Sequence, residues 1–369
     1  MILFVSEVTG GGSTGFMGFA RLVREAGENV NYYEQTPQPT PARLAVEHCP
    51  HNPADMAAFQ LFKQQATPPA QYSFKYGKRP EELQNSALQW YGHYWREFES
   101  QIYSAGLDTV VVWGSGIVGN RAAILAAEDL GLDVRVLEDG WFPYPKGWQD
   151  CPQDARSFIV SPGRAYYEYD RWPDVWQESY DSFEFDEERF EIYRESWLRS
   201  RVTKYTGTPR QRFNIDDEAE LPEAWVNAEE GDRVVWAGQV HGDAALFWNC
   251  PDEATLSELQ ADAREKHVWY KGHPFTDNLS DPKGLRTLPR ELNIHSFLAD
   301  ADRVLVLTSN VGLEATMFDT PAYIYGNPIY KAVPEDDRKG FVDWTLCCLQ
   351  AHAMDPALFM RRLKGDYSV

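Results

Sequence analysis

The chain alternates short apolar runs with longer segments of helical periodicity. The runs are rich in β-branched residues, as parallel strands covered on both faces would be. Glycines or hydroxyl-bearing residues follow many of them, and a helix-forming segment often comes next. This repeated order of strand, turn and helix predicts an α/β protein with parallel sheets. The strands that we predict span residues 2–5, 109–113, 133–137, 157–160, 233–238, 267–271, 304–307 and 322–325.

A polar stretch that contains acidic residues and prolines divides these strands into two groups. We therefore predict two Rossmann-like domains whose parallel sheets face a central cleft. The first domain spans residues 1–205, with insertions, and the second spans 232–345. A linker at 206–231 separates them, and a C-terminal helix covers 346–369. A long helix at 81–105 carries aromatic residues at helical spacing, a pattern that is typical of core packing.

Composition narrows the classes of function. The chain of 369 residues has a hydrophobic content of 43% and a formal net charge of −21. This negative charge argues against a general nucleic-acid binder, because a phosphate backbone requires a basic face. A local basic pocket for an anionic substrate remains compatible with it. No apolar run reaches the roughly 18 residues of a transmembrane helix.

Cysteine usage and the N-terminal residues indicate the compartment. The five cysteines are scattered and show no spacing typical of a zinc site. The first residues lack the basic region of a signal peptide and predict a strand instead. We therefore predict a cytoplasmic protein, a location that is compatible with peripheral association with the inner membrane or with a larger assembly.

The clearest candidate site follows the predicted strand at 304–307. Thr308, Ser309 and Asn310 are suited to capping the helix that comes next. Gly312 allows a close backbone approach, and Glu314 in the first turn complements the helix dipole. A polar turn of this kind lies at the carboxyl end of a strand, where ligands bind in open α/β sheets. Its backbone N–H groups, including that of Val311, are available to an anion.

Two further strand ends in the second half carry polar groups. Gln239 and Asp243 follow one strand, and Lys271 and His273 follow the next. Together they supply a carboxylate, a cation and an imidazole, which suit a phosphate ester beside a reacting carbon. The proline after His273 favours an extended backbone there. A lone histidine is more often a structural residue, and for His241 the functional interpretation has less support.

The first half offers a second set of candidates. Gly11 and Gly12 lie in a glycine loop after the first strand, where they serve either a tight turn or the approach of a sugar acceptor. Arg121 follows a second glycine-containing loop. Glu138 and Asp139 are adjacent acids at the end of a strand. The Asp-Gly pair is either a simple turn or part of acid/base chemistry.

Several motifs, in their order along the chain, resemble the capsule polysaccharide biosynthesis family. They are Glu138-Asp-Gly-Trp141, Gly238-Gln-Val-His-Gly-Asp243, Lys271-Gly-His-Pro274, Thr308-Ser-Asn-Val-Gly-Leu-Glu-Ala315, Thr320-Pro-Ala322 and Tyr325-Gly-Asn-Pro-Ile-Tyr330. The resemblance covers roughly residues 109–330. This family includes retaining transferases of β-Kdo (3-deoxy-D-manno-octulosonic acid) in bacterial capsule and O-antigen assembly.

The resemblance implies a GT-B-like glycosyltransferase that moves β-Kdo from CMP-β-Kdo to a surface glycan or its lipid-linked precursor. It implies Asp243 as the nucleophile that forms a glycosyl–enzyme intermediate and Glu138 as the acid/base group. The resemblance also implies a reaction that needs no metal and no cofactor besides the donor substrate. Donor-nucleotide binding would fall to Lys271, His273, Ser309, Asn310, Val311, Gly312 and Glu314. Sugar or acceptor binding would fall to Gln239, Asp139, Arg121, Gly11 and Gly12.

Physical chemistry is compatible with these roles, and some alternatives stay open. Two carboxylates suit a retaining displacement, and a helix terminus with cations can neutralise a phosphate without a metal ion. The segment 141–144 (Trp-Phe-Pro-Tyr) departs from the basic and small residues that are usual in the family, so the acceptor or the sugar can differ. Asp139 is a rival to Glu138. The donor could also be CMP-sialic acid or a UDP- or GDP-sugar, or the chain could be a non-catalytic scaffold of capsule assembly.

Overall fold

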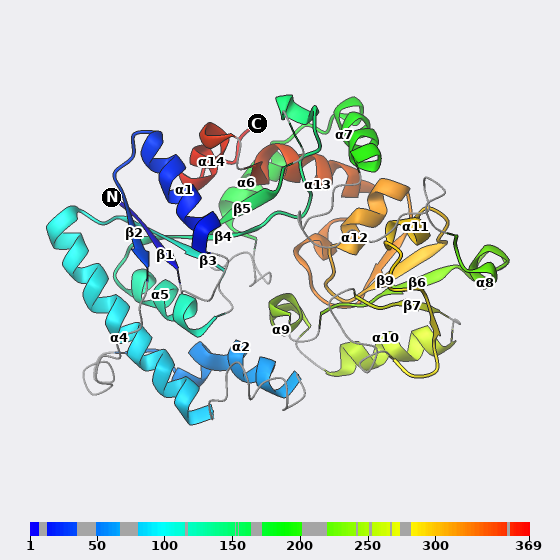
Figure 1. Cartoon of the computed structure of the whole chain (residues 1–369), viewed down its shortest axis with the longest axis horizontal. Helices are drawn as coiled ribbons and strands as arrows, with labels where there is room; N and C mark the ends of the chain where they lie inside the picture. The colour runs from blue at the N-terminus through cyan, green and yellow to red at the C-terminus, as the bar shows by residue number, and fades with distance from the viewer. Residues whose placement is uncertain are drawn as a thin grey trace. The chain divides into compact units, whose positions relative to one another are not determined.

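The computed structural model describes residues 1–6, 13–34, 49–66, 80–114, 117–151, 153, 155–163, 172–200, 220–240, 243–250, 253–265, 268–273, 282–352 and 355–369. The chain forms two compact units (Figure 1). The first comprises Met1–Phe183, Arg199–Lys204 and Thr345–Val369, and the second comprises Glu184–Leu198 and Tyr205–Trp344. The units thus differ from the predicted boundaries, because residues 184–198 belong to the second unit and residues 345–369 to the first. The predicted central cleft stays a prediction.

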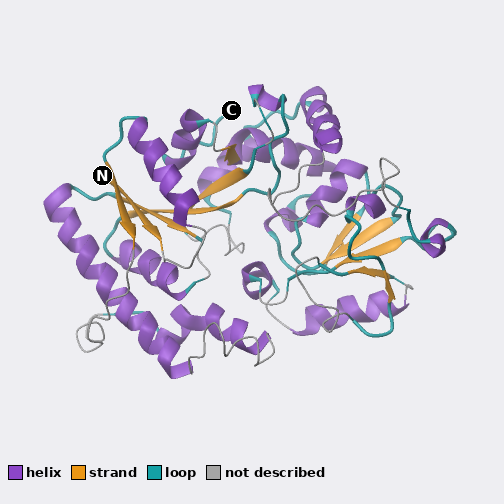
Figure 2. Cartoon of the chain, in the orientation of Figure 1, coloured by secondary structure: helices purple, strands orange, loops and turns teal. Residues whose placement is uncertain are grey.

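Each unit has its own sheet (Figure 2). The strands of the first are β1 (Ile2–Ser6), β2 (Val30–Glu34), β3 (Thr109–Trp113), β4 (Asp133–Asp139), β5 (Ser157–Pro162) and β11 (Gln350–His352). Those of the second are β6 (Val234–Ala237), β7 (Trp269–Lys271), β8 (Arg286–Thr287), β9 (Arg303–Val306) and β10 (Ala322–Ile324).

Helices connect and cover these strands. The α-helices of the described residues are α1 (Ser13–Glu25), α2 (Pro53–Ala66), α4 (Pro80–Ala105), α5 (Val118–Asp129), α6 (Asp174–Asp181), α7 (Glu187–Ser200), α8 (Glu223–Val226), α9 (Ala244–Asn249), α10 (Glu253–Glu265), α11 (His295–Leu298), α12 (Val311–Glu314), α13 (Arg338–Trp344) and α14 (Pro356–Leu363). Within the described ranges, no helix is long and apolar enough to cross a membrane.

The first sheet has the strand order β11-β5-β4-β3-β1-β2. Strands β1 to β4 are parallel, as predicted for β1, β3 and β4, whereas β2 was not among the predicted strands. Strand β3 spans the residues that the apolar pattern indicates. Strand β5 is antiparallel to β4, and β11 is antiparallel to β5. The prediction of a fully parallel sheet is therefore wrong for this unit. Between β4 and β5 the described residues hold a 3₁₀ turn (Trp148–Asp150) and an antiparallel bridge between Tyr144 and Ala155. They hold no crossover helix, and the chain returns in the opposite direction.

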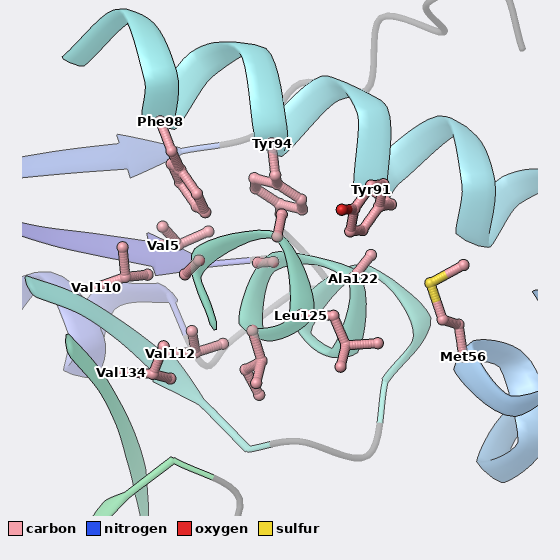
Figure 3. Close-up of a cluster of buried hydrophobic side chains, with 14 of the residues drawn as sticks. Val5, Met56, Tyr91, Tyr94, Phe98, Val110, Val112, Ala122, Leu125 and Val134 are labelled. Carbon is pink, nitrogen blue, oxygen red and sulfur yellow. The ribbon is translucent and has the colours of Figure 1, made fainter. Parts of the chain in front are cut away.

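One face of the first sheet is covered by α4 and α5. Tyr91, Tyr94 and Phe98 of α4 point into a cluster that includes Val112 of β3 and Leu125 of α5 (Figure 3). Tyr94 and Phe98 have no exposed surface. The aromatic stripe predicted from the helical spacing is therefore core packing, and it fixes a long helix against the sheet.

The second sheet is fully parallel, with the order β10-β9-β6-β7-β8. Strand β6 comes first in sequence and lies in the middle, with β7 on one side and β9 on the other. From β6 the chain continues to β7 and β8 on one side, and then returns to add β9 and β10 on the other side. The topological switch point therefore lies between β6 and β9. Ligands bind at the carboxyl ends of strands at such a point.

The predicted linker at 206–231 is wrong for its last part. Helix α8 lies within that range, and its Trp225 is fully buried in the second unit. The indole packs edge-on against Trp269 and Phe297, with ring centroids 5.6 and 5.4 Å away. Burial of so large an aromatic side chain stabilises the core by a few kcal/mol, so this segment belongs to the domain.

The predicted C-terminal helix at 346–369 is only partly correct. The chain continues from α13 through a buried π-helical turn (Thr345–Leu349) into strand β11, and only then into α14. Arg362 of α14 is fully buried and donates hydrogen bonds to the carbonyls of Cys347 (2.5 Å) and Asp366 (2.6 Å). The end of the chain is thereby fixed to the first unit.

Candidate active site

Gln239 joins the two strand ends at the switch point of the second sheet. It follows β6, and Thr308 follows β9. The Gln239 Nε2 donates to Thr308 Oγ1 over 2.7 Å, and the Thr308 N–H donates back to Gln239 Oε1 over 3.3 Å. The reciprocal pair fixes the spacing of the two strand ends. In the structure Gln239 thus positions the site, whereas its predicted contact with the sugar stays a prediction.

Asp243 is held at the start of α9. Its backbone is extended (φ −67°, ψ 137°), and its Oδ1 accepts the N–H of Ala245 at 2.9 Å. An N-cap bond of this kind fixes the direction of the carboxylate relative to the helix. The negative charge of Asp243 acts on the imidazole of His273. Two of the predicted site residues therefore lie close together.

His273 follows β7 and carries no charge at neutral pH. Burial is the main cause that lowers the pKa of its imidazole from 6.5 to about 4. Asp243 opposes this shift, and the positive charges of Lys271 and Arg290 add to it. A neutral imidazole can donate or accept a hydrogen bond but adds no positive charge. His273 could thus hold a phosphate only through a hydrogen bond, unless binding itself protonates the ring.

Lys271 is the buried cation of this site. Only 3% of the residue is exposed. Its Nζ donates to the carbonyls of Gly272 and Arg290, each over 3.3 Å. The ammonium therefore connects the end of β7 to the segment that contains Arg290. It contributes a positive field to the strand edge and donates two hydrogen bonds to backbone carbonyls.

The turn after β9 is ordered by its own side chains. Of the three predicted capping residues, Ser309 makes the bond, since its Oγ accepts the N–H of Val311 at 3.3 Å. The Ser309 carbonyl accepts the hydroxyl of Tyr330. A Cβ on Gly312 would lie 2.6 Å from that hydroxyl, so this glycine is needed for packing against Tyr330. The single turn of α12 then passes into a 3₁₀ turn (Ala315–Phe318).

Glu314 connects the turn to the helix beneath it. Its Oε1 accepts the side-chain N–H of Asn310 at 3.2 Å, and its Oε2 lies 2.7 Å from Nε2 of His295. His295 packs edge-on against Trp197, with centroids 4.8 Å apart. Glu314 therefore holds the side chain of Asn310 through a hydrogen bond. Its contact with the donor stays a prediction. His295 was missed by the sequence analysis, because no spacing relates it to the motif at 308–314.

Arg290 is a second residue that the sequence analysis missed. Its Nη1 donates to the carbonyl of His273 at 3.0 Å. Its guanidinium lies over Gly272, where a Cβ would be 2.6 to 2.9 Å from the guanidinium atoms. The glycine in Lys-Gly-His is thus required by the arginine that packs on it. A glycine between two basic residues at a strand end was the available signal, but it does not say which distant side chain fills the space.

In the first unit, Glu138 lies over the turn that follows β3. Gly114 in this turn has φ +70°, and a Cβ there would lie 2.8 Å from Glu138 Oε1. Asp139 points to the other face of β4, as alternation along a strand requires, and forms an ion pair with Arg156. Asp139 is thus held by a salt bridge, and the choice between the two rival acids for the chemistry stays a prediction.

The aromatic segment after Asp139 belongs to the core of the first unit. Trp141, Phe142 and Tyr144 are at least nine-tenths buried. Gln350 Oε1 accepts the N–H groups of Trp141 (2.5 Å) and Phe142 (2.9 Å), and its Nε2 donates to the Phe142 carbonyl at 3.0 Å. The aromatic side chains of this segment are thus part of the core, and Gln350 of β11 holds its backbone.

The remaining predicted residues add little to the described site. Arg121 lies in the first turns of α5 and is 8% exposed, so little of its surface is accessible to an acceptor. Gly11, Gly12 and His241 lie outside the described residues. Among the residues that the structure does describe, no group of three or more His, Cys, Asp and Glu side chains could hold a metal ion.

The candidate site residues of the second unit lie within a segment that is similar to known proteins. The model of the capsule polysaccharide biosynthesis protein family matches residues 184–334. Asp243, His273, Arg290 and the turn after β9 all lie within this match. Capsule polysaccharide modification protein LipA of Neisseria meningitidis serogroup A / serotype 4A is 23% identical over 250 residues, which are 63% of this chain and 34% of LipA. The chain thus spans about a third of that relative's length.

Two solved structures are also similar. Thermosulfurimonas dismutans KpsC, a β-Kdo 2,7 transferase, aligns over 99% of this chain and 100% of its own, with a TM-score of 0.50 and 17% identity. A β-Kdo 2,4 transferase structure of KpsC from the same organism aligns over 62% of this chain and 71% of its own, with a TM-score of 0.48 and 21% identity. The chain is therefore similar to capsule polysaccharide biosynthesis proteins in sequence and to the β-Kdo 2,7 transferase KpsC in fold.

Proposed function

We propose that the chain is a retaining glycosyltransferase that moves β-Kdo from CMP-β-Kdo to a bacterial surface glycan, of capsule or lipopolysaccharide, or to its lipid-linked precursor. The observation that carries the proposal is that the Asp243 carboxylate acts on the His273 imidazole at the strand ends of the second sheet, where Gln239 also joins Thr308 at the switch point. The similarity to KpsC and LipA supports the proposal of a transferase in capsule polysaccharide assembly.

The proposed reaction has two displacements at the anomeric carbon. In the first, a carboxylate oxygen of Asp243 bonds to that carbon, the bond to the phosphate oxygen breaks, and CMP leaves with the bonding electrons. In the second, Glu138 takes the proton of the acceptor hydroxyl, whose oxygen bonds to the anomeric carbon and releases Asp243. Two inversions give net retention. CMP is a good leaving group, so its departure needs no strong acid.

Positive charge at the end of β7 suits the departing phosphate. Lys271 is buried there and charges the strand edge, while neutral His273 supplies a hydrogen bond. Fixed donors and charges of this kind stabilise charge that develops in the transition state, because they need no reorganisation. The proposal therefore includes metal-independent transfer.

The test is a mass measurement of the intact protein after incubation with CMP-Kdo. We expect an added mass of one Kdo on a peptide that contains Asp243, and none in Asp243→Asn. Asparagine caps a helix about as well as aspartate, so this variant should keep the start of α9 intact. Asp302→Asn is the matched control, because Asp302 also accepts backbone N–H groups, from Gly231 and Arg233, each at 2.9 Å.

Three outcomes would contradict the proposal. Normal Kdo transfer by Asp243→Asn would exclude the covalent mechanism. Transfer from a UDP- or GDP-sugar, without binding of CMP or CMP-Kdo, would exclude the donor. Loss of activity in Asp302→Asn to the same extent as in Asp243→Asn would show that the carboxylate of Asp243 matters only for the fold.

A further inference from the structure

The end of β7 requires a source of positive charge if it is to bind a phosphate or a carboxylate. His273 is neutral at pH 7, because its pKa is lowered to about 4. The ammonium of Lys271 is buried and donates to two carbonyls. Arg290 is the other cation that acts on His273. It is only partly buried, so part of its surface is accessible.

Arg290 is fixed in place by three contacts. Its Nη1 donates to the His273 carbonyl at 3.0 Å, and its own carbonyl accepts from Lys271 Nζ at 3.3 Å. Its guanidinium packs flat against Gly272, where no side chain could fit without displacing it. Side chain and backbone of Arg290 are thus both tied to the end of β7. An ordered guanidinium loses little conformational freedom when it binds a ligand.

The chemistry of a guanidinium selects the kind of ligand. Its planar set of N–H groups matches two oxygens of a carboxylate or a phosphate, and such charged bonds are stronger than neutral ones. Because Asp243 also acts on His273, an anion held beside His273 would lie close to the proposed nucleophile. A nucleotide-activated acidic sugar carries its two anionic groups, the phosphate and the carboxylate, on the anomeric carbon that the nucleophile attacks.

We infer that Arg290 binds an oxyanion of the donor beside His273, through its guanidinium. The inference rests on the proposed function for the identity of the donor, and on the geometry of Gly272, His273 and Arg290 for the site. The oxyanion is the phosphate of the nucleotide or the carboxylate of the sugar, and binding measurements with the variants distinguish these sources.

The first experiment uses inorganic phosphate and follows the imidazole of His273 by NMR. We expect phosphate to raise the pKa of His273 in the wild type, because a nearby anion favours the charged ring. Arg290→Gln should weaken phosphate binding about tenfold to a hundredfold, as the loss of a hydrogen bond to a charged group would. Arg303→Gln is the matched control. Arg303 lies at the amino-terminal end of β9, away from the carboxyl ends of the strands. Its guanidinium is 5.4 Å from the ring of Tyr323.

The second experiment compares cytidine, CMP and CMP-Kdo by calorimetry in the wild type and in Arg290→Gln. If the guanidinium binds the phosphate, the variant loses affinity for CMP and CMP-Kdo alike and keeps its affinity for cytidine. If it binds the carboxylate, only CMP-Kdo is affected. Gly272→Ala should reproduce the effect of Arg290→Gln, because the added Cβ displaces the guanidinium while the charge remains.

The inference and the proposed function fail in different ways. Wild-type affinities of Arg290→Gln for phosphate, CMP and CMP-Kdo would overturn the inference, even with a normal Kdo adduct on Asp243. No response of the wild type to phosphate, CMP or CMP-Kdo would overturn it as well. A phosphate site that depends on Arg290, in a protein that forms no Kdo adduct, would support the inference and contradict the function.

Discussion

Replacement of Gly114 by alanine should move the carboxylate of Glu138 without removing it. Gly114 has φ +70°, a region that costs alanine about 1 kcal/mol. The new Cβ would lie 2.8 Å from Glu138 Oε1, whereas ordinary contact begins at 3.4 Å. The carboxylate must therefore shift by the difference, about 0.6 Å. Because it ends a flexible side chain, the shift itself should cost little stability.

The shift should be visible in the rate of transfer. A displacement on the order of 1 Å can cost about a hundredfold in rate. We therefore expect kcat/KM for Kdo transfer to a glycan acceptor to fall about tenfold or more in Gly114→Ala. The Kdo adduct on Asp243 should form at the wild-type rate, because Glu138 acts only on the acceptor in the proposed mechanism.

Gly131→Ala is the matched control for this experiment. Gly131 has φ +71°, and nothing lies within 4 Å of the position of its Cβ. Both variants thus carry the same backbone strain, and only Gly114→Ala displaces Glu138. Denaturant unfolding should show a similar loss of about 1 kcal/mol in each. Equal transfer rates in the two variants, or a slower adduct step in Gly114→Ala, would refute the role assigned to Glu138.

Three further predictions concern the second unit. Asp243→Asn should lose the Kdo adduct and keep the unfolding free energy of the wild type. Asp243→Ala should lose the adduct and also about 1 kcal/mol of stability, because the helix loses its cap. Denaturant unfolding measures both, and a large loss of stability in the asparagine variant would contradict this prediction. Arg189→Ala should destabilise by about 3 kcal/mol or more, because fully buried Asp343 loses its charged partner at 2.6 and 2.7 Å and keeps the N–H of Asp186 at 3.1 Å. Glu187→Ala, at an exposed position of the same helix, should change little in the same assay. The pKa of His273 is lower in the folded protein (about 4) than its usual 6.5, so the unfolded chain binds more protons between these values. Stability from this group should be complete above about pH 6.5 and fall by at most about 3 kcal/mol as the pH drops to 4, and His273→Gln should remove that slope; an unchanged slope would contradict the assignment.

The sequence identified buried strands better than edge strands. Residues 109–113 are apolar because β3 lies inside the first sheet, and the prediction matches the structure. Strand β2 has the sequence Val-Asn-Tyr-Tyr-Glu and lies at an edge, and both residues of β8 are exposed. Neither carries an apolar run. Their extended state comes from pairing with β1 and β7, which a local pattern does not reveal.

The direction of β5 and the place of β11 also depended on long-range contacts. Both strands have apolar or buried residues, which suit either direction of pairing. Gln350 of β11 is tied to the backbone at 141 and 142, more than 200 residues earlier in the chain. A contact over such a separation depends on the whole topology, so the segment looked helical from its own residues.

The sequence by itself determined the two-sheet α/β plan and the polar residues that follow its buried strands, because burial and turn chemistry act over a few neighbouring residues. Only the tertiary structure decided the order of the strands, and with it which of those residues meet. It joined Gln239 to Thr308 across 69 positions, placed Arg290 on Gly272, and lowered the pKa of His273 by burial. These are properties of packed surfaces and of a low-dielectric surrounding, and they exist only once distant segments have come together.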